Sequence, residues 1–298
     1  MTNRDTFSSF HPTVNLSYFV IIIGFSMFFM HPISLGTSLL CSSLYAIYLY
    51  GKKALRIGLL FMLPMVILTA SLNPLFNHAG VTMIAFLPNG NPITLESIIY
   101  GIAAATMLIT VIIWFACLNA VMTSDKFIYL FGRAIPALSL ILSMSLRFVP
   151  RFKAQIKVIS NAQKGIGRDV KSGNIFKRAK HGIKILSIMI TWALENAIET
   201  ADSMKSRGYG LLGRTAFSIF NFDKRDGWSC AYIFACATIV MIGGITAAYS
   251  FRYFPTIRGQ WRGFPTIMVF AAYLALGAFP LIVNFKEDIV WRRIKSKI

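Results

Sequence analysis

The run LESIIYGIAAATMLITVIIWFACLNAVMT, residues 95–123, leads directly into a strongly basic segment, residues 124–226. The apolar run is long enough to cross the hydrocarbon core of a bilayer, which takes about twenty apolar residues in a helix. The basic segment carries 18 of the chain's 30 Lys and Arg residues. This succession predicts a membrane protein that holds a large cationic surface on one side of the bilayer.

The composition of the whole chain supports a membrane class. Hydrophobic residues make up 56% and charged residues 14% of the 298 residues, against about 25% charged in soluble domains. A net charge of +19 would suggest a nucleic-acid partner in a soluble protein. Because most of this charge flanks apolar runs, we attribute it to membrane orientation and to anionic membrane lipid, and we expect no nucleic-acid partner.

Six apolar runs are candidate transmembrane helices, so the predicted fold class is an all-α integral membrane protein with about six spans plus a cytoplasmic pair of long amphipathic helices. We expect transmembrane helices 1–4 within residues 1–123, a cytoplasmic domain at 124–226, helices 5–6 within 227–285 and a basic tail at 286–298. The runs are residues 16–31, 33–50, 55–73, 95–123, 228–250 and 265–285.

The loops between the runs predict an orientation. Residues 74–94 carry no Lys or Arg and are typical of an ordered loop with a short strand, whereas residues 51–56, the insert and the tail are basic. The positive-inside rule then places both termini and the insert in the cytoplasm of a multi-pass cell-membrane protein. Arg252, Arg258 and Arg262 fall on the outside of this scheme, against 27 Lys and Arg residues on the inside.

The basic insert is expected to hold two long amphipathic helices. The first runs from about Pro136 to Gly165, with a bend or break caused by Pro150. The second runs from about Ile183 to Ser206, and Gly208 ends it. Each keeps an apolar stripe at spacings of three and four. The stripes are Phe148, Phe152, Ile156 and Ile159 in the first helix, and Ile190, Leu194, Ala197, Ala201 and Met204 in the second.

Two interpretations of this helix pair compete. The helices could lie passively on the cytoplasmic leaflet as interfacial helices, or they could form a docking platform for another protein. Glu195, Glu199 and Asp202 form an acidic stripe on the second helix. Anionic lipid would repel this stripe, so the sequence favours docking.

Several stretches resemble the transmembrane (T) component of energy-coupling factor (ECF) transporters, the EcfT/CbiQ-like family of ATP-driven micronutrient importers. The likeness covers nearly the whole chain. It is carried by Tyr129-Leu130-Phe131-Gly132, Ser145-Leu146-Arg147-Phe148-Val149-Pro150, Ala162-Gln163-Lys164, Ala201-Asp202-Ser203-Met204-Lys205-Ser206-Arg207-Gly208-Tyr209-Gly210 and Arg214-Thr215.

This resemblance implies a transmembrane scaffold of an importer of vitamins or transition-metal ions, with the two long helices acting as coupling helices. The implied partners are two ABC ATPase subunits, which would hold ATP and Mg²⁺, and a small membrane-embedded substrate-binding S component. The apolar stripes would then serve coupling-helix packing and contact with the S component. The chain itself is expected to bind no cofactor directly.

The family carries a short Ala-Arg-Gly-type motif at the end of each coupling helix, and these ends dock on the ATPase subunits. The second motif matches as Ser206-Arg207-Gly208. The first departs, because the chain reads Gly165-Ile166-Gly167-Arg168, with Ile166 where Arg is expected. Either Arg168 has taken over the docking role or this contact is apolar. The glycines on either side of Ile166 permit a backbone turn that would favour Arg168.

Other classes lack support in the sequence. It contains no Walker motif, no HExxH and no GxSxG, and its four histidines are scattered. We therefore expect a non-catalytic subunit without a metal site. The alternatives are a conventional ABC permease and an integral-membrane lipid-modifying enzyme. The permease would have a short coupling loop in place of a hundred-residue insert, and the enzyme would show clustered His, Asp or Glu.

Overall fold

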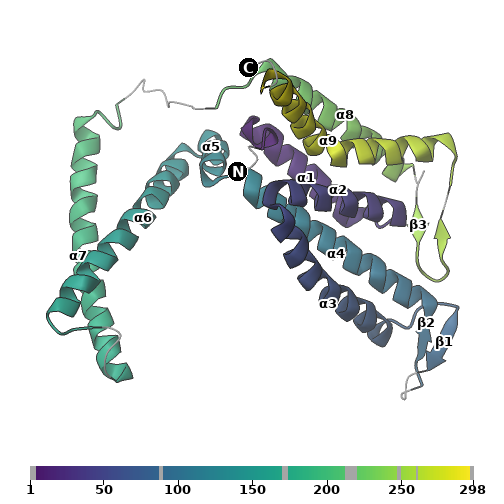
Figure 1. The fold of residues 1–298 in the computed structure, drawn as a ribbon, viewed down its shortest axis with the longest axis horizontal. Helices are drawn as coiled ribbons and strands as arrows, with labels where there is room; N and C mark the ends of the chain where they lie inside the picture. The colour runs from purple at the N-terminus through teal and green to yellow at the C-terminus, as the bar shows by residue number, and fades with distance from the viewer. Residues whose placement is uncertain are drawn as a thin grey trace. The chain divides into compact units, whose positions relative to one another are not determined.

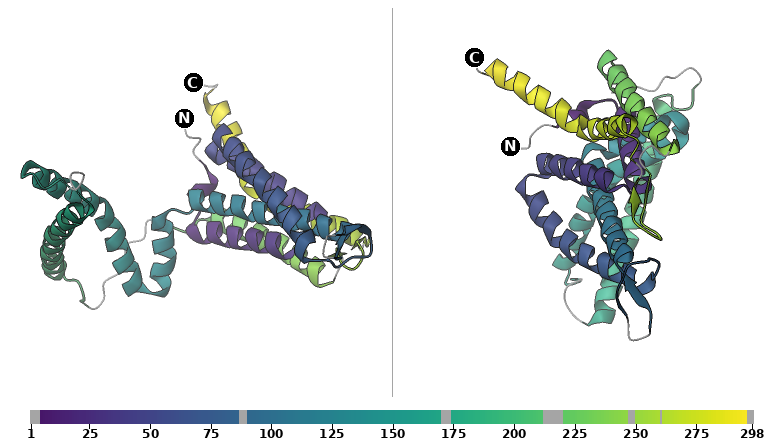
Figure 2. Two further views of the ribbon diagram at one scale, coloured as in Figure 1. Left: turned by 90° about the horizontal axis from the view of Figure 1, so that it is seen from below. Right: turned by 90° about the vertical axis from the view of Figure 1, so that its right-hand side faces the viewer.

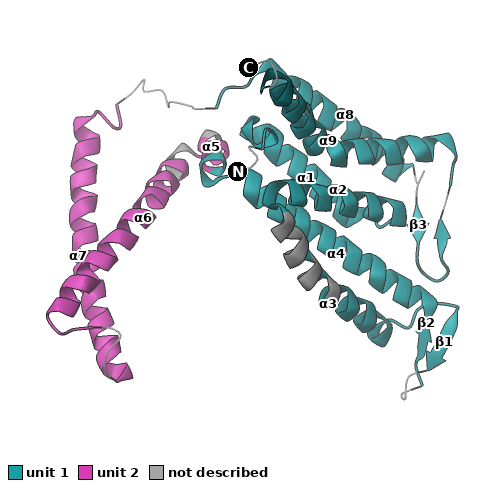
Figure 3. Cartoon of the chain, in the orientation of Figure 1, with its two compact units in different colours: residues 1–127, 220–298 teal, residues 128–219 magenta. Residues whose placement is uncertain are grey.

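The computed structural model describes residues 5–86, 90–169, 174–211, 220–246, 250–259 and 261–295. They form two compact units, residues 1–127 with 220–298, and residues 128–219 (Figure 3). Across these described ranges the long elements are helices, and the strands belong to two short hairpins. The predicted fold class, an all-α membrane protein, is confirmed.

The first unit contains a helix at each of the six predicted apolar runs (Figure 1). Four of these helices, α2, α4, α8 and α9, are long and apolar enough to cross a membrane, and Pro12–Phe28 and Pro64–Phe76 are shorter apolar helical stretches. The bounds are α1 (Pro12–Phe28), α2 (Pro32–Tyr50), α3 (Lys52–Phe76), α4 (Leu95–Val121), α8 (Lys224–Ile245) and α9 (Phe264–Lys295).

Local sequence explains where several of these helices begin. Both α1 and α2 start with a His-Pro pair. His11 Nδ1 accepts a hydrogen bond from the Thr13 amide at 3.3 Å, and His31 Nδ1 accepts one from the Ile33 amide at 3.2 Å. Proline is favoured at a first helical position because its missing N–H would be unpaired there anyway. Helix α8 begins at a capping box formed by Asp223 and Asp226.

Helix α9 extends further than the sequence indicated. It continues through residues 286–295 of the predicted basic tail. Arg292, Arg293 and Lys295 lie in its last turn. Cations at that position interact favourably with the helix dipole, so the basic residues support the helix end and do not interrupt it.

The centre of the first unit is a buried aromatic and hydroxyl cluster around Trp114. The Trp114 indole N–H donates to Ser38 Oγ at 3.1 Å, and Ser38 Oγ lies 2.8 Å from Ser26 Oγ. Ser26 Oγ in turn lies 3.2 Å from the Tyr273 hydroxyl. This network joins α1, α2, α4 and α9 with neutral groups that are hydrogen-bonded to one another, as buried polar groups require.

Two hairpins connect helices at one end of this unit. Strand β1 (Met83–Phe86) pairs with β2 (Pro92–Thr94) between α3 and α4, which confirms the strand expected within residues 74–94. Strand β3 (Phe251–Arg252) pairs with β4 (Arg258–Gly259) between α8 and α9. Both pairs are antiparallel.

At the opposite end, the N-terminal segment is tied to the helices by buried polar contacts. Asn284 of α9 accepts from the Thr6 and Phe7 amides at 2.8 and 3.2 Å and donates to Asp5 at 2.6 Å. Lys126 is buried and donates to the carbonyls of Ser8 and Val121. Burial lowers the pKa of the Lys126 ammonium. This lysine, counted above among the insert's cations, therefore contributes to the packing of the first unit.

The second unit consists of two long helices and the end of a short one. Helix α5 (Ser124–Ala134) leads into α6 (Pro136–Gly165), and α7 (Ile175–Ser206) crosses α6 (Figures 1 and 2). The predicted bounds of α6 are confirmed. Helix α6 runs through Pro150 without a break. Helix α7 starts earlier than the predicted Ile183, because Asn174 caps it by accepting from the Ile175 amide at 2.7 Å.

Candidate functional site

The end of α7 is a complete Schellman motif. The amide of Tyr209 donates to the Met204 carbonyl at 3.0 Å, and the amide of Gly208 donates to the Lys205 carbonyl at 2.9 Å. Gly208 has a φ of 76°, which L-residues other than glycine adopt at a cost. A Cβ at Gly208 would also lie 2.9 Å from Leu211 Cδ1. The glycine of Ser206-Arg207-Gly208 is thus required by the turn, and the turn fixes where the neighbouring arginine sits.

The end of α6 is built in the same way. The amide of Arg168 donates to the Gln163 carbonyl at 2.9 Å, and the amide of Gly167 donates to the Lys164 carbonyl at 3.0 Å. Gly167 has a φ of 79°. These are the two hydrogen bonds of the Schellman motif, so α6 also ends in one.

The shared motif aligns the two ends residue by residue. Gly167 corresponds to Gly208, and Ile166 therefore occupies the C-cap position that Arg207 occupies in α7. Arg168 lies one residue beyond the glycine and corresponds to Tyr209. The departure in the first motif is consequently a change of side chain at an unchanged backbone position.

Both ends present their side chains to solvent. Ile166 is 68% exposed, and Arg168 and Arg207 are exposed as well. Ser206 Oγ donates to the Ser203 carbonyl at 2.9 Å, so this hydroxyl supports the last turn of α7. Lys164 and Asp169 form an ion pair of 3.6 Å across the end of α6. Each end therefore combines a fixed backbone with an exposed C-cap side chain, cationic in α7 and apolar in α6.

The two helices are held together where they cross. The buried residues there are Ile159 of α6 and Ile185 and Met189 of α7. Trp192 packs against them, its ring 5.7 Å from the Phe152 ring, and the Arg151 guanidinium lies 5.7 Å from the centroid of the Trp192 ring. Burial of large apolar side chains at one crossing gives the pair a defined geometry.

Only part of the predicted stripes lies at this crossing. In α6, Ile159 is buried and Phe152 is half-buried, with the Phe148 ring stacked on Phe152 at 5.8 Å, while Ile156 is exposed. In α7 the predicted stripe faces away from α6. Ile190 and Leu194 are 51% and 61% exposed, Ala197 and Ala201 are exposed, and Met204 is half-buried.

The residues of α7 that do contact α6 were missed. Ile185, Met189 and Trp192 follow one another at spacings of four and three, as the predicted stripe does, on an adjacent face of the helix. The three-and-four spacing of apolar residues was present in the sequence, but two neighbouring stripes of α7 share it.

Two residues that carry the resemblance, Arg214 and Thr215, lie outside the described residues. Within the described residues, no group of three or more His, Cys, Asp and Glu side chains is placed to hold a metal ion.

One unit contains helices that can span a membrane, and the other contains two crossed helices with exposed Schellman ends. The chain is therefore a multi-pass membrane protein that carries a separate helical module. Its place among known proteins follows from comparison. The chain belongs to the CbiQ family, described as cobalt transport protein, whose family model matches residues 7–218. The match includes every stretch that carried the resemblance, from Tyr129 to Thr215, and ends before α8 and α9.

Individual relatives carry a different printed name. Proteins named energy-coupling factor transporter transmembrane protein EcfT match from Lactobacillus helveticus, with 36% identity over 114 residues (38% of this chain, 41% of the relative), and from Lactococcus lactis, with 40% identity over 90 residues (30% and 34%). The protein of that name from Staphylococcus aureus is 33% identical over 114 residues (38% and 42%). Each match covers less than half of the relative. These names point to a transporter component and not to an enzyme.

Proposed function

We propose that this chain is the transmembrane subunit of an ECF-type importer and that the ends of α6 and α7 dock on two ABC ATPase subunits. The observation that carries the proposal is the pair of matched Schellman ends, each with an exposed C-cap side chain. Figure 1 shows these two ends at opposite ends of the crossed pair, as two separate docking points require.

Arg207 would provide the polar contact. A guanidinium is always charged and presents several N–H donors in a rigid plane, so it suits a groove lined by carboxylate or carbonyl oxygens. The partner ATPases would hold ATP and Mg²⁺ and supply the chemistry. When they close and reopen, the packed crossing at Ile159, Ile185 and Met189 would let α6 and α7 move as one body and pass that displacement on.

The receiver of this motion would be a small membrane-embedded S component. The predicted stripe of α7 is suited to contact it, because Ile190, Leu194, Ala197 and Ala201 are exposed and are not used in the crossing. The S component would select the cargo, a vitamin or a transition-metal ion. This chain would then need neither a substrate site nor a cofactor of its own.

Co-purification tests the proposal. We expect the tagged full chain, solubilised in mild detergent, to retain two ATPase subunits and one small, very hydrophobic subunit. Recovery of the ATPases without a hydrophobic third subunit would favour a conventional permease. Recovery of neither, from membranes in which all candidate subunits are present, would contradict the proposed assembly.

The charge distribution supports an orientation with both termini and the second unit in the cytoplasm. We expect a membrane-impermeant thiol reagent, added to intact cells, to label Cys introduced at Val81 or Trp261, which are 64% and 60% exposed. The same reagent should reach Cys at Ile166 or Leu211 only after permeabilisation. A Cys-free background serves as the control, and labelling of position 166 in intact cells would contradict the orientation.

A further inference from the structure

The β3–β4 hairpin carries two arginines directly opposite each other, because Arg252 and Arg258 are register partners. They are two of the three arginines that the proposed orientation places outside. Directly opposite residues of an antiparallel pair have Cβ atoms about 4.5–5.5 Å apart, and like charges in such a pair are destabilising. Within the described parts of the chain, no acidic side chain lies within 4.0 Å of either guanidinium. The two arginines therefore form a paired cationic site that an external anion would stabilise.

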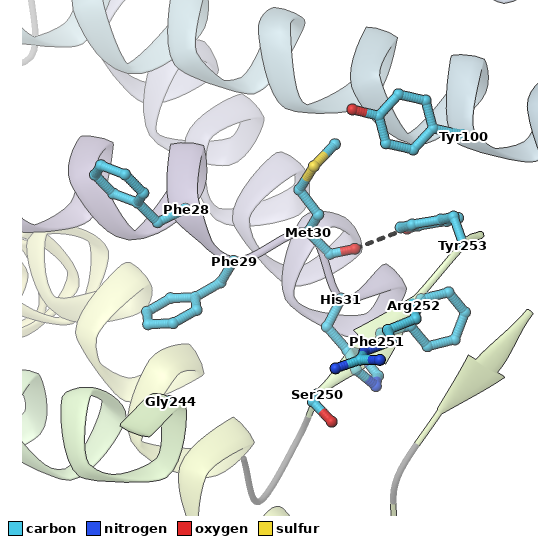
Figure 4. Close-up of a pocket in the computed structure, with 10 residues that line it drawn as sticks. All are labelled: Phe28, Phe29, Met30, His31, Tyr100, Gly244, Ser250, Phe251, Arg252 and Tyr253. Atoms are coloured by element: carbon cyan, nitrogen blue, oxygen red, sulfur yellow. Dashed lines mark hydrogen bonds between the residues drawn. The ribbon is translucent and has the colours of Figure 1, made fainter. Parts of the chain in front are cut away.

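The hairpin is held firmly against the helices. Tyr253, next to Arg252, is 5% exposed, and its hydroxyl donates to the Met30 carbonyl at 2.7 Å (Figure 4). The Tyr253 ring also lies 5.5 Å from the Tyr100 ring of α4. These contacts join the hairpin to the α1–α2 turn and to α4, so the backbone of Arg252 is fixed in place.

An open pocket lies at this hairpin. It has a volume of about 460 Å³, and Arg252 lines it together with the polar side chains of His31, Ser250 and Tyr100 (Figure 4). His31 begins α2 and Gly244, also in the lining, lies near the end of α8. A position at helix ends corresponds to the level where lipid headgroups meet the hydrocarbon.

A second, apolar groove continues from this pocket between α1 and α8. It has a volume of about 450 Å³ and shares Phe28, Phe29 and Gly244 with the first pocket. The other lining residues are apolar, among them Val20 and Met241, which are 61% and 48% exposed. At Gly24 an added Cβ would meet no atom within 4 Å, so this glycine leaves the groove open.

We propose that the hairpin and this groove form a binding site for an anionic glycerophospholipid. The phosphate would lie at Arg252 and Arg258, and an acyl chain would run from Phe28 and Phe29 along the groove past Gly24. A free anion would use the arginines but would leave the adjoining apolar groove without a function. A zwitterionic lipid would fill the groove and would also offer a phosphate, but its quaternary ammonium would bring a further positive charge beside the two arginines. The site depends on membrane insertion and is independent of docking on ATPases.

The test is a lipid titration of the delipidated full-length protein in detergent, read by native mass spectrometry. The probes are phosphatidylglycerol and phosphatidylcholine with identical acyl chains. We expect the wild-type protein to bind phosphatidylglycerol at least about tenfold more tightly, since both lipids offer a phosphate but only phosphatidylglycerol lacks the compensating ammonium that like-charged arginines disfavour. In the double variant Arg252→Gln and Arg258→Gln the preference should disappear. In Gly24→Leu, binding of both lipids should fall.

Matched controls separate this site from general effects. Lys286→Gln removes one exposed cation from α9 at the other end of the unit, and Gly36→Leu adds the same side chain to α2 at a glycine that also has no atom within 4 Å of its Cβ position. Both should bind like the wild type. Equal wild-type affinity for the two lipids, or an unchanged preference in the double arginine variant, would overturn the proposal. Full displacement of phosphatidylglycerol by millimolar inorganic phosphate would also overturn it, in favour of a free-anion site.

Discussion

Replacing Arg207 with Glu is expected to abolish transport and to uncouple ATP hydrolysis from it, while the protein still reaches the membrane. Arg207 is an exposed C-cap side chain whose backbone is held by Gly208. In the proposed complex its guanidinium meets carboxylate or carbonyl oxygens. A glutamate at this position would bring a like charge to those acceptors, and losing one partner of a buried charged contact costs about 2–5 kcal/mol. Transport and ATP hydrolysis of the reconstituted complex measure the effect.

A charge reversal elsewhere on the same helix is the control for this variant. Lys177→Glu makes the same kind of change at an exposed position near the start of α7, away from the docking end. We expect it to retain transport. Arg207→Lys should give an intermediate loss, because an ammonium keeps the charge but not the planar set of donors. Normal transport by a well-expressed Arg207→Glu protein would exclude Arg207 from docking.

Helix ends were predictable where the sequence carries a local signal. Pro136 at the first position and glycine after the last turn mark α6, and its bounds were predicted correctly. The start of α7 was placed too late, at Ile183. The segment from Phe176 to Lys184 is basic, so apolar periodicity marked only the part of α7 from Ile183 onward, whereas Asn174 caps the helix at Ile175. Here hydrophobic periodicity was a poorer guide than capping.

The face of α7 that contacts α6 could not be chosen from periodicity. Ile190 and Leu194 are four residues apart, as Ile185 and Met189 are, and their stripe lies one residue later in phase because Ile190 directly follows Met189. Only the position of α6 decides which stripe is buried. The contacts of Asn284 with Thr6 and Phe7 were equally out of reach, since they join residues 278 and 277 positions apart in the chain. Long-range polar contacts of this kind produce no periodic pattern in the sequence.

The first docking motif is where structure adds most to the sequence. The sequence left Ile166 and Arg168 as alternatives, and the flanking glycines favoured Arg168. The matched Schellman ends place Ile166 in the position of Arg207. We therefore expect Ile166→Ala to lower the retention of one ATPase subunit about tenfold or more, since full burial of an isoleucine side chain contributes about 1.5–3 kcal/mol. Arg168→Ala should have a much smaller effect. Subunit retention on the detergent-solubilised complex is the measurement.

Val158→Ala is the matched control for the isoleucine variant. It truncates another exposed apolar side chain of α6, at 60% exposure, within the helix and away from its end. Because no docking role is assigned to that position, retention should be unchanged. A loss confined to Arg168→Ala would show that the cation beyond the glycine makes the contact and that equal backbone positions do not imply equal roles. Full retention by Ile166→Ala, by Arg168→Ala and by the double variant would remove this helix end from the docking surface, and coupling would then rest on α7 alone.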